Sequence, residues 1–354
     1  MSTLKVLLIG EYPPPYAGIA VQTKYLHELF SSNGITNEIL ATLPSKYGRN
    51  SKLGRIRYLR GIVSLIIYVM QLPRIRRFTV IHILSSSGLN FYIHTLPALV
   101  TAKMLGKATI IHYHGGQAES FFSTRKWLFN FSVYLADRLI VPSGFLEDVF
   151  INLGAKPLVI PNVIDLSKLV FRERNVIHPI LLSARNLTTT YNIACAIRAF
   201  KHIKDRFCEA QMIIAGEGPE LDYLIKLSKE LNLHNSIKFE GNVDNDRMID
   251  LYNRADILIN TSNIDNMPIS ILEAQAMGLL VISTRAGGVP YIIRHNTTGL
   301  LADLDNDDEI ANNIIYAIEN QSHSLSMIEA SRIQVATFDK HLILQQWKNL
   351  YAQF

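Results

Sequence analysis

The fold is decided by residues 257–283, which read ILINTSNIDNMPISILEAQAMGLLVIS. Ile257–Asn260 is a short apolar run of the kind that forms a buried strand. A polar loop follows, and Pro268 then suits an early position of a helix over Ile269–Met277. A second apolar run, Leu280–Ser283, comes soon after that helix. Strand, helix and strand in this order predict two parallel strands joined by a helical crossover.

The same alternation of short apolar runs and helical patterns extends along the whole chain. It predicts parallel sheets covered by helices on both faces, and therefore an α/β fold. The further strands are expected at Lys5–Ile9, Val80–Leu84, Ala108–His112, Arg138–Val141, Leu158–Ile160, Ile180–Ser183, Gln211–Ala215 and Ile237–Glu240. The further helices are expected at Val21–Ser31, Ile93–Leu105, Ile193–Asp205, Pro219–Leu231 and Asp246–Arg254.

The alternation runs twice, and a polar stretch, Asp165–His178, separates the two runs. We therefore predict two doubly wound, Rossmann-like domains that face each other. The N-terminal domain covers residues 1–168, the C-terminal domain covers 176–336, and 337–354 form a closing helix that packs back across the domains. Because ligands bind at the carboxyl ends of strands in such sheets, the site is expected in the cleft between the domains.

Composition excludes several classes of protein. With 48% hydrophobic and 18% charged residues among 354, the chain is neither disordered nor a coiled coil. Two cysteines, Cys195 and Cys208, make no disulfide framework, which favours a reducing compartment. No signal peptide is expected, and the longest apolar run, near Ile62–Leu72, is too short to span a bilayer. We expect a cytoplasmic protein, with peripheral contact at the inner membrane face left open.

Charge is distributed unevenly. Residues 1–170 hold 18 Lys and Arg against 8 Asp and Glu, whereas residues 171–354 hold 17 against 22. The basic excess concentrates in Lys46–Arg77, which contains no acid and encloses the apolar run Ile62–Met70. Such a segment suits an anionic membrane surface, although a core helix with solvated arginines at its ends remains the alternative. No nucleic-acid partner is expected, because no recognised motif accompanies the arginines.

Three glycine-containing turns can hold a phosphate, because backbone N–H groups at a helix start favour an anion. They are Gly10–Gly18, Gly216–Pro219 and Arg285–Pro290, and each of them can equally be a simple connection. None is a G-x-G-x-x-G motif in the right place, which argues against a dinucleotide-dependent dehydrogenase.

Two carboxylates flank the start of the helix in the opening stretch. Asp265 precedes the helix and Glu273 lies inside it, among apolar neighbours. A carboxylate there can accept hydrogen bonds from two adjacent hydroxyls, as a ribose or a hexose presents. The alternatives are a helix cap for Asp265 and a solvated helix residue for Glu273.

Several short motifs follow the order and spacing of a known family. Asp265 stands eight residues before Glu273, and Ala274, Gly278, Ser283 and Gly287–Pro290 come next. The other motifs are the Pro-rich turn ending at Gly18, Ile111–Gly116, Val141–Ser143, Ile160–Asp165, Ala215–Glu220, Phe239–Gly241 and Ala255–Asp256. Together they resemble the retaining glycosyltransferases of family 4 over essentially the whole chain. The resemblance implies the two-domain GT-B fold.

The resemblance also implies that a nucleotide sugar binds mainly to the C-terminal domain. Glu273 would hold the ribose, Asp265 would contact hydroxyls of the transferred sugar, and Gly18 would let a loop approach the diphosphate. His114 would lie beside the donor sugar; a strand-end histidine with a backbone partner is the alternative, and His112 could be that residue. The catalytic residues implied are His114, Arg185 and Asp265. The donor-binding residues implied are Gly18, Asn186, Tyr191, Gly216, Glu217, Phe239, Gly241, Met267, Pro268, Ile269 and Glu273, with the base near residues 239–243.

The chain departs from the family pattern at two places. Asp265 replaces the usual glutamate, which shortens its reach by one methylene. The loop that normally gives an arginine and a lysine to the diphosphate reads ARNLTTTYN over residues 184–192, with Tyr191 at the lysine position. Arg185 stands one place early, with Asn186 in its usual position; Arg285 is a further candidate cation. The Arg-Asn-Leu…Tyr loop is similar to that of a bacterial subgroup of the family.

The reaction implied is transfer with retention and without a metal. No metal ligands and no cofactor are expected, since the nucleotide sugar, UDP- or GDP-linked, is a co-substrate; Asp303–Asp308 is interpreted as a solvated acidic loop. The acceptor would be a glycan or a lipid-linked glycan in surface polysaccharide or lipopolysaccharide synthesis. The alternative is a non-catalytic sugar-nucleotide-binding partner or scaffold protein, motivated by Asn186 and Tyr191. A nucleotide-sugar epimerase of the same fold fits the motifs less well.

Overall fold

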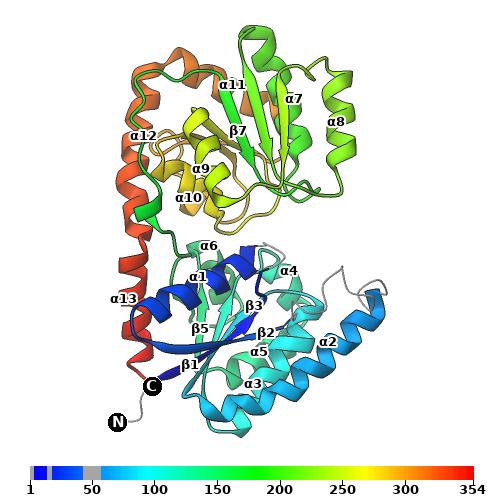
Figure 1. The fold of residues 1–354 in the computed structure, drawn as a ribbon, viewed down its shortest axis with the longest axis vertical. Coiled ribbons are helices and arrows are strands. Elements are labelled where there is room, and N and C mark those ends of the chain that lie inside the picture. Colours follow the sequence, from blue (N-terminus) through cyan, green and yellow to red (C-terminus); the bar gives the residue numbers. More distant parts are fainter. Residues whose placement is uncertain (1–3, 14–17, 43–56) are drawn as a thin grey trace. The chain divides into compact units, whose positions relative to one another are not determined.

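The computed structural model describes residues 4–13, 18–42 and 57–354. The chain divides into two compact units, Met1–Val163 with Lys340–Phe354, and Ile164–Asp339. Each unit contains one sheet with helices on both faces, as Figure 1 shows. Both sheets have six parallel strands, which confirms the expected α/β fold with two Rossmann-like domains.

The sheet of the first unit has the strand order β2-β1-β3-β4-β5-β6. The order reverses between β1 and β3, so this pair marks the switch point where such sheets bind ligands. The strands are β1 (Lys5–Gly10), β2 (Thr36–Ala41), β3 (Val80–Ser85), β4 (Ala108–Tyr113), β5 (Arg138–Val141) and β6 (Leu158–Val159). The helices are α1 (Gly18–Ser32), α2 (Arg57–Gln71), η3 (Leu72–Arg77), η4 (Phe91–Thr95), α3 (Leu96–Met104), α4 (Ala118–Ser123), α5 (Lys126–Leu135), α6 (Gly144–Asn152) and α13 (Lys340–Tyr351).

The sheet of the second unit has the order β12-β11-β10-β7-β8-β9, with its switch point between β7 and β10. The strands are β7 (Ile180–Ala184), β8 (Gln211–Ala215), β9 (Ile237–Gly241), β10 (Ile257–Asn260), β11 (Leu280–Thr284) and β12 (Leu300–Ala302). The helices are η5 (Leu166–Lys168), α7 (Ile193–Arg206), α8 (Leu221–Glu230), α9 (Asn245–Arg254), α10 (Ile269–Ala276), η6 (Val289–Tyr291), α11 (Asp307–Glu319), α12 (Gln321–Val335) and η7 (Ala336–Phe338).

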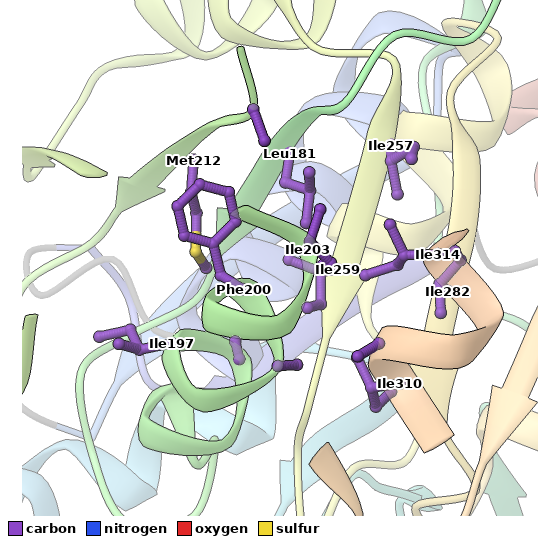
Figure 2. Packing of buried hydrophobic residues seen from close by; sticks show 14 of the residues in the cluster. Leu181, Ile197, Phe200, Ile203, Met212, Ile257, Ile259, Ile282, Ile310 and Ile314 are labelled. Carbon is purple, nitrogen blue, oxygen red and sulfur yellow. The ribbon is translucent and has the colours of Figure 1, made fainter. Parts of the chain in front are cut away.

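Each sheet has a hydrophobic core on both faces, because successive strand residues point to opposite sides. In β7, Leu181 belongs to the core that α7 and α11 cover, and Leu182 belongs to the core that contains α10 residues. Figure 2 shows the first of these cores, with Phe200 of α7 and Ile310 of α11 packed around strand side chains such as Ile259. Strands buried on both faces explain why the expected runs were uniformly apolar.

Two strands were not expected, and one expected helix has an irregular first turn. β2 and β12 were not predicted, since β2 is an edge strand with Thr36, Asn37 and Glu38 in its sequence, and β12 has only three residues. The helix expected over Ile93–Leu105 is present: the π-helical turn η4 runs directly into α3, and Thr95 and Leu96 at the junction both have right-handed helical dihedrals. Pro97 lacks the N–H for a helical hydrogen bond, and it lies where the π-helical turn passes into α3.

The C-terminal helix α13 belongs to the first unit. Its Trp347 and Tyr351 pack against Phe30 of α1, with ring centroids 6.2 and 5.5 Å apart. None of the helices in the described residues is both long enough and apolar enough to cross a membrane.

Candidate active site

Arg185 and Asp265 meet at the switch point of the second sheet. Arg185 follows β7, and the loop that carries Asp265 follows β10, the neighbouring strand. The Arg185 guanidinium forms an ion pair with the Asp265 carboxylate, and it lies 4.1 Å from the ring centroid of Tyr191. The two charged side chains are only 14% and 10% exposed. The structure thus brings together three residues that the sequence placed in the site.

The Asp265 loop is held by several hydrogen bonds. One carboxylate oxygen of Asp265 accepts from the Asn266 N–H at 2.9 Å, and the other accepts from the Ser262 hydroxyl at 3.3 Å. The Asp265 carbonyl accepts from the Gly288 N–H at 3.0 Å. A Cβ on Gly288 would lie 1.8 Å from the Asn266 carbonyl oxygen, so glycine is required there. The Gly287–Gly288 turn therefore packs against the loop that carries Asp265 and stabilises it.

Glu273 lies in α10, where its carboxylate accepts a hydrogen bond of 2.8 Å from the Tyr252 hydroxyl. Burial raises the pKa of Glu273 to about 7, and the Tyr252 bond only partly offsets this. Glu273 is therefore not the solvated helix residue that was its alternative interpretation. Tyr252 was missed by the sequence reasoning, because its place on α9 reads as an ordinary core position.

The turns after β8 and β9 pack against the Arg185 loop. The Gly216 N–H donates to the Gly241 carbonyl at 2.8 Å, and the Leu187 N–H donates to the Glu217 carbonyl at 2.9 Å. Gly216 has a φ of +149°, and a Cβ there would lie 2.1 Å from the Arg185 carbonyl oxygen. Glycine at this turn lets the loop after β7 approach closely, which positions Arg185.

The other residues predicted to bind the donor vary in exposure. Asn186 is exposed, the Glu217 side chain is exposed, and Phe239 packs partly against the core. Met267 and Pro268 are buried just before α10, and Ile269 is half-buried. Met267 belongs to a hydrophobic core cluster, so its side chain anchors the loop.

His114 directly follows β4 in the first unit. Its ring centroid lies 4.1 Å from that of His112, and burial lowers the pKa of His114 to about 4, so the imidazole is neutral at pH 7. The alternative that His112 bonds a backbone group is wrong, because its Nδ1 lies 3.1 Å from Nε2 of His82. His82 was not among the predicted residues; its position in an apolar strand gave no signal beyond that of a core residue.

The remaining predictions fall on exposed or undescribed positions. Gly18 starts α1, and a Cβ there would touch nothing within 4 Å. Residues 14–17 of its turn and 43–56 of the basic segment lie outside the described residues. In the acidic loop, Asp305 and Asp307 pair with Arg198 at 2.8 and 3.0 Å. Arg285 lies 3.5 Å from Asp303, so this candidate cation already has a carboxylate partner.

Comparisons with known proteins concern the two halves of the chain and its fold. Residues 16–168 match the model of Glycosyltransferase Family 4, and residues 170–334 match that of Glycosyl transferases group 1. N-acetyl-alpha-D-glucosaminyl L-malate synthase of Bacillus anthracis is 27% identical over 173 residues, which are 49% of this chain and 45% of that protein. One component of human phosphatidylinositol N-acetylglucosaminyltransferase is 28% identical over 232 residues, 62% of this chain and 46% of that protein.

The chain spans about half the length of these two curated relatives, and it spans a smaller share of some others. Across the whole chain the likeness is one of fold. The crystal structure of Anabaena HepE in complex with UDP has a TM-score of 0.75 at 18% identity, over 99% of this chain and 100% of that one. With two parallel sheets of this topology, the chain has the GT-B fold, and its two halves match two glycosyltransferase family models in chain order.

Proposed function

We propose that the protein is an active, retaining glycosyltransferase that moves a sugar from a UDP- or GDP-linked donor to an acceptor hydroxyl without a metal. The observation that carries this proposal is the Arg185–Asp265 pair beside Tyr191 at the switch point of the second sheet. The pair would offer a cation for a diphosphate and a carboxylate for sugar hydroxyls at one edge, the edge where doubly wound sheets bind ligands.

In this proposal the donor replaces the contacts that the side chains make with one another. Arg185 turns from Asp265 towards the diphosphate. Its Nε, which has no hydrogen-bond partner among the described residues, donates to the diphosphate in this arrangement. Asp265 then accepts from hydroxyls of the transferred sugar, and Glu273 from those of the ribose. The Ser270 hydroxyl, buried in the first turn of α10 and likewise without a partner in the described chain, offers the diphosphate another donor.

Catalysis would rest on positioning and on positive charge at the leaving group. The bond between the sugar and the diphosphate breaks while the acceptor hydroxyl attacks the same face of the sugar. The departing phosphate takes the proton of that hydroxyl, so no protein nucleophile is needed. Neutral His114 would contact the donor sugar through a hydrogen bond.

A panel of nucleotide sugars tests the donor assignment. We expect that one nucleotide family among UDP-, GDP-, ADP- and dTDP-sugars raises the melting temperature of the protein with EDTA present. A ligand at 100 times its dissociation constant adds about 2.7 kcal/mol to the free energy of unfolding. A shift that appears only with added divalent cations would contradict metal independence. A shift without donor consumption, in an extract of candidate acceptors, would favour the non-catalytic alternative.

The acceptor is proposed to be a glycan carried on a lipid, used for a surface polysaccharide or lipopolysaccharide. The name of the human relative, which includes phosphatidylinositol, supports a lipid-borne acceptor. Exposed aromatic rings on the first unit, in a part of the sequence rich in Lys and Arg, support it as well. Residues 57–135 hold nine Lys and Arg and one acid, Glu119.

This surface centres on α5. Trp127, Phe131 and Tyr134 follow one another at helical spacing and are 67, 42 and 74% exposed. On α3, which packs against α5, Met104 is 81% exposed, and the Lys103 ammonium lies 5.8 Å from the Tyr134 ring centroid. Exposed aromatic rings beside lysines suit the interface of an anionic bilayer. We therefore extend the proposed membrane contact from Lys46–Arg77 to this face.

Sedimentation with vesicles tests the contact. We expect binding to phosphatidylglycerol-containing vesicles that weakens in about 0.5 M salt, because salt screens charge attraction. Replacing Trp127 and Tyr134 together by serine should reduce the bound fraction about tenfold, through lost burial of two aromatic rings. Tyr223→Ser is the matched control, since Tyr223 is an exposed tyrosine (51%) of the second unit. Binding that is indifferent to lipid charge and to salt would contradict the proposal.

A further inference from the structure

A chain of buried polar rings links the C-terminal helix to the end of β4. The Tyr351 hydroxyl of α13 lies 2.7 Å from Nδ1 of His82 in β3. Nε2 of His82 lies 3.1 Å from Nδ1 of His112 in β4, and the His112 ring packs on that of His114. Tyr351, His82 and His112 are at most 2% exposed. Trp347 packs on these rings, with its ring centroid 4.7 Å from that of His82 and 5.1 Å from that of His112.

These hydrogen bonds can run in two directions, which differ in the tautomers of His82 and His112. Burial lowers the pKa of His82 to about 3 and that of His112 well below its usual value, so both rings are neutral at pH 7. A neutral imidazole has one N–H donor and one acceptor nitrogen. In the direction that uses the Tyr351 proton, the hydroxyl donates to Nδ1 of His82. Nε2 of His82 then donates to Nδ1 of His112, and the proton of His112 is left on Nε2.

Two nitrogens at the histidine end of this row of rings make no hydrogen bond to the described residues. Nε2 of His112 and Nε2 of His114 are buried, and within the described residues neither has a hydrogen-bond partner. They lie at the carboxyl end of β4, next to β3 of the switch-point pair. In the direction that starts at Tyr351, His112 is a donor at Nε2, and a buried donor without an acceptor is costly. An oxygen atom of a bound substrate is the group that would satisfy it.

We propose that Tyr351 and His82 are positioning residues for the transfer reaction, holding His112 as an Nε2–H donor beside His114 for an oxygen of the bound sugar. The inference rests on the proposed function, in which His114 contacts the donor sugar. Under this proposal helix α13 contributes a positioning residue to the site, in addition to its packing on the core. It also explains why polar rings occupy strand positions that are otherwise apolar.

Tyr351→Phe tests the proposal, because it removes the hydroxyl and keeps the ring that packs on Phe30 and Trp347. In the full chain with ¹⁵N-labelled histidine, we expect the nitrogen spectra to show His112 protonated at Nε2. In Tyr351→Phe we expect mixed tautomers at His82 and His112. Tyr316→Phe is the matched control, since it removes an exposed 3.0 Å contact between Tyr316 and His323. It should leave His82 and His112 unchanged.

Kinetics distinguish positioning from packing. With UDP-glucose as the probe, we expect Tyr351→Phe to lower kcat for its hydrolysis about tenfold and to change KM less than twofold. His82→Gln keeps one donor and one acceptor, so it should retain more turnover than His82→Leu, at comparable melting temperatures. Equal losses in these two variants, or His112 tautomers that do not respond to Tyr351→Phe, would overturn the proposal.

Failure of the proposed function has a different signature. A wild-type protein that neither binds nor hydrolyses any nucleotide sugar would contradict the transferase assignment. The nitrogen spectra would still decide whether Tyr351 directs the protons of His82 and His112. If Tyr351→Phe lowers the melting temperature too far to be studied, His82→Gln and His82→Leu carry the test.

Discussion

Glu273→Ala is expected to weaken nucleotide-sugar binding at least 100-fold. The two ribose hydroxyls would donate to one charged carboxylate, and hydrogen bonds to charged groups contribute about 1.5–3 kcal/mol each. Loss of about 3 kcal/mol corresponds to roughly a 100-fold change in the dissociation constant. Titration calorimetry with the nucleotide sugar that stabilises the protein measures it. Glu230→Ala is the control, because Glu230 is an exposed glutamate on α8. An unchanged dissociation constant in Glu273→Ala would remove Glu273 from the site.

The pH dependence of binding sharpens this test. Burial raises the pKa of Glu273 to about 7 in the free protein, so much of it is protonated at neutral pH. Hydroxyl donors favour the ionised carboxylate, and the donor should therefore release a proton when it binds. Affinity should rise with pH through 7 and should fall about tenfold for each pH unit below 7. In Glu273→Gln this dependence should disappear, whereas a flat profile in the wild type would contradict the assignment.

Arg185→Ala is expected to lower kcat about 100- to 1,000-fold. Removing one preorganised group that stabilises developing charge costs about 3–4 kcal/mol of transition-state stabilisation. Arg185 would be the main cation for the leaving diphosphate, because Tyr191 occupies the position of the usual lysine. Steady-state rates with saturating donor measure the effect. Arg206→Ala is the control, since Arg206 pairs with Glu319 on the surface with 64% of its side chain exposed.

Two further variants separate catalysis from stability. Removing Arg185 leaves the Asp265 carboxylate, only 10% exposed, without its cation, which destabilises the loop. Adding Asp265→Asn should therefore restore the melting temperature without restoring turnover. Tyr191→Lys in the Arg185→Ala background should recover part of the lost rate, because it returns a cation to the family's position. Full turnover in Arg185→Ala alone would contradict its role.

The apolar runs predicted much of the secondary structure because strands buried on both faces must be apolar along their whole length. Ile257–Asn260 and Gln211–Ala215 were predicted with the bounds that the structure has. Polar edge strands such as β2 were not predicted, because the side chains on one of their faces are largely polar. The π-helical turn before Pro97 was not predicted either, because a helical pattern continues on both sides of it.

The fold class, the succession of strands and helices, and the residue types of the candidate site could be predicted from local sequence patterns. Periodicity, turn chemistry and motif spacing are local properties, and they can be read along the chain. Which of these residues lie in contact depends on how the strands and helices pack. Arg185 and Asp265 are 80 positions apart, and they pair because β7 and β10 are neighbours at the switch point. His82 and Tyr351 are 269 positions apart, and the return of α13 to the first unit joins them. The charge state of Glu273 was decided in the same way, because a pKa depends on burial by residues that are distant in sequence.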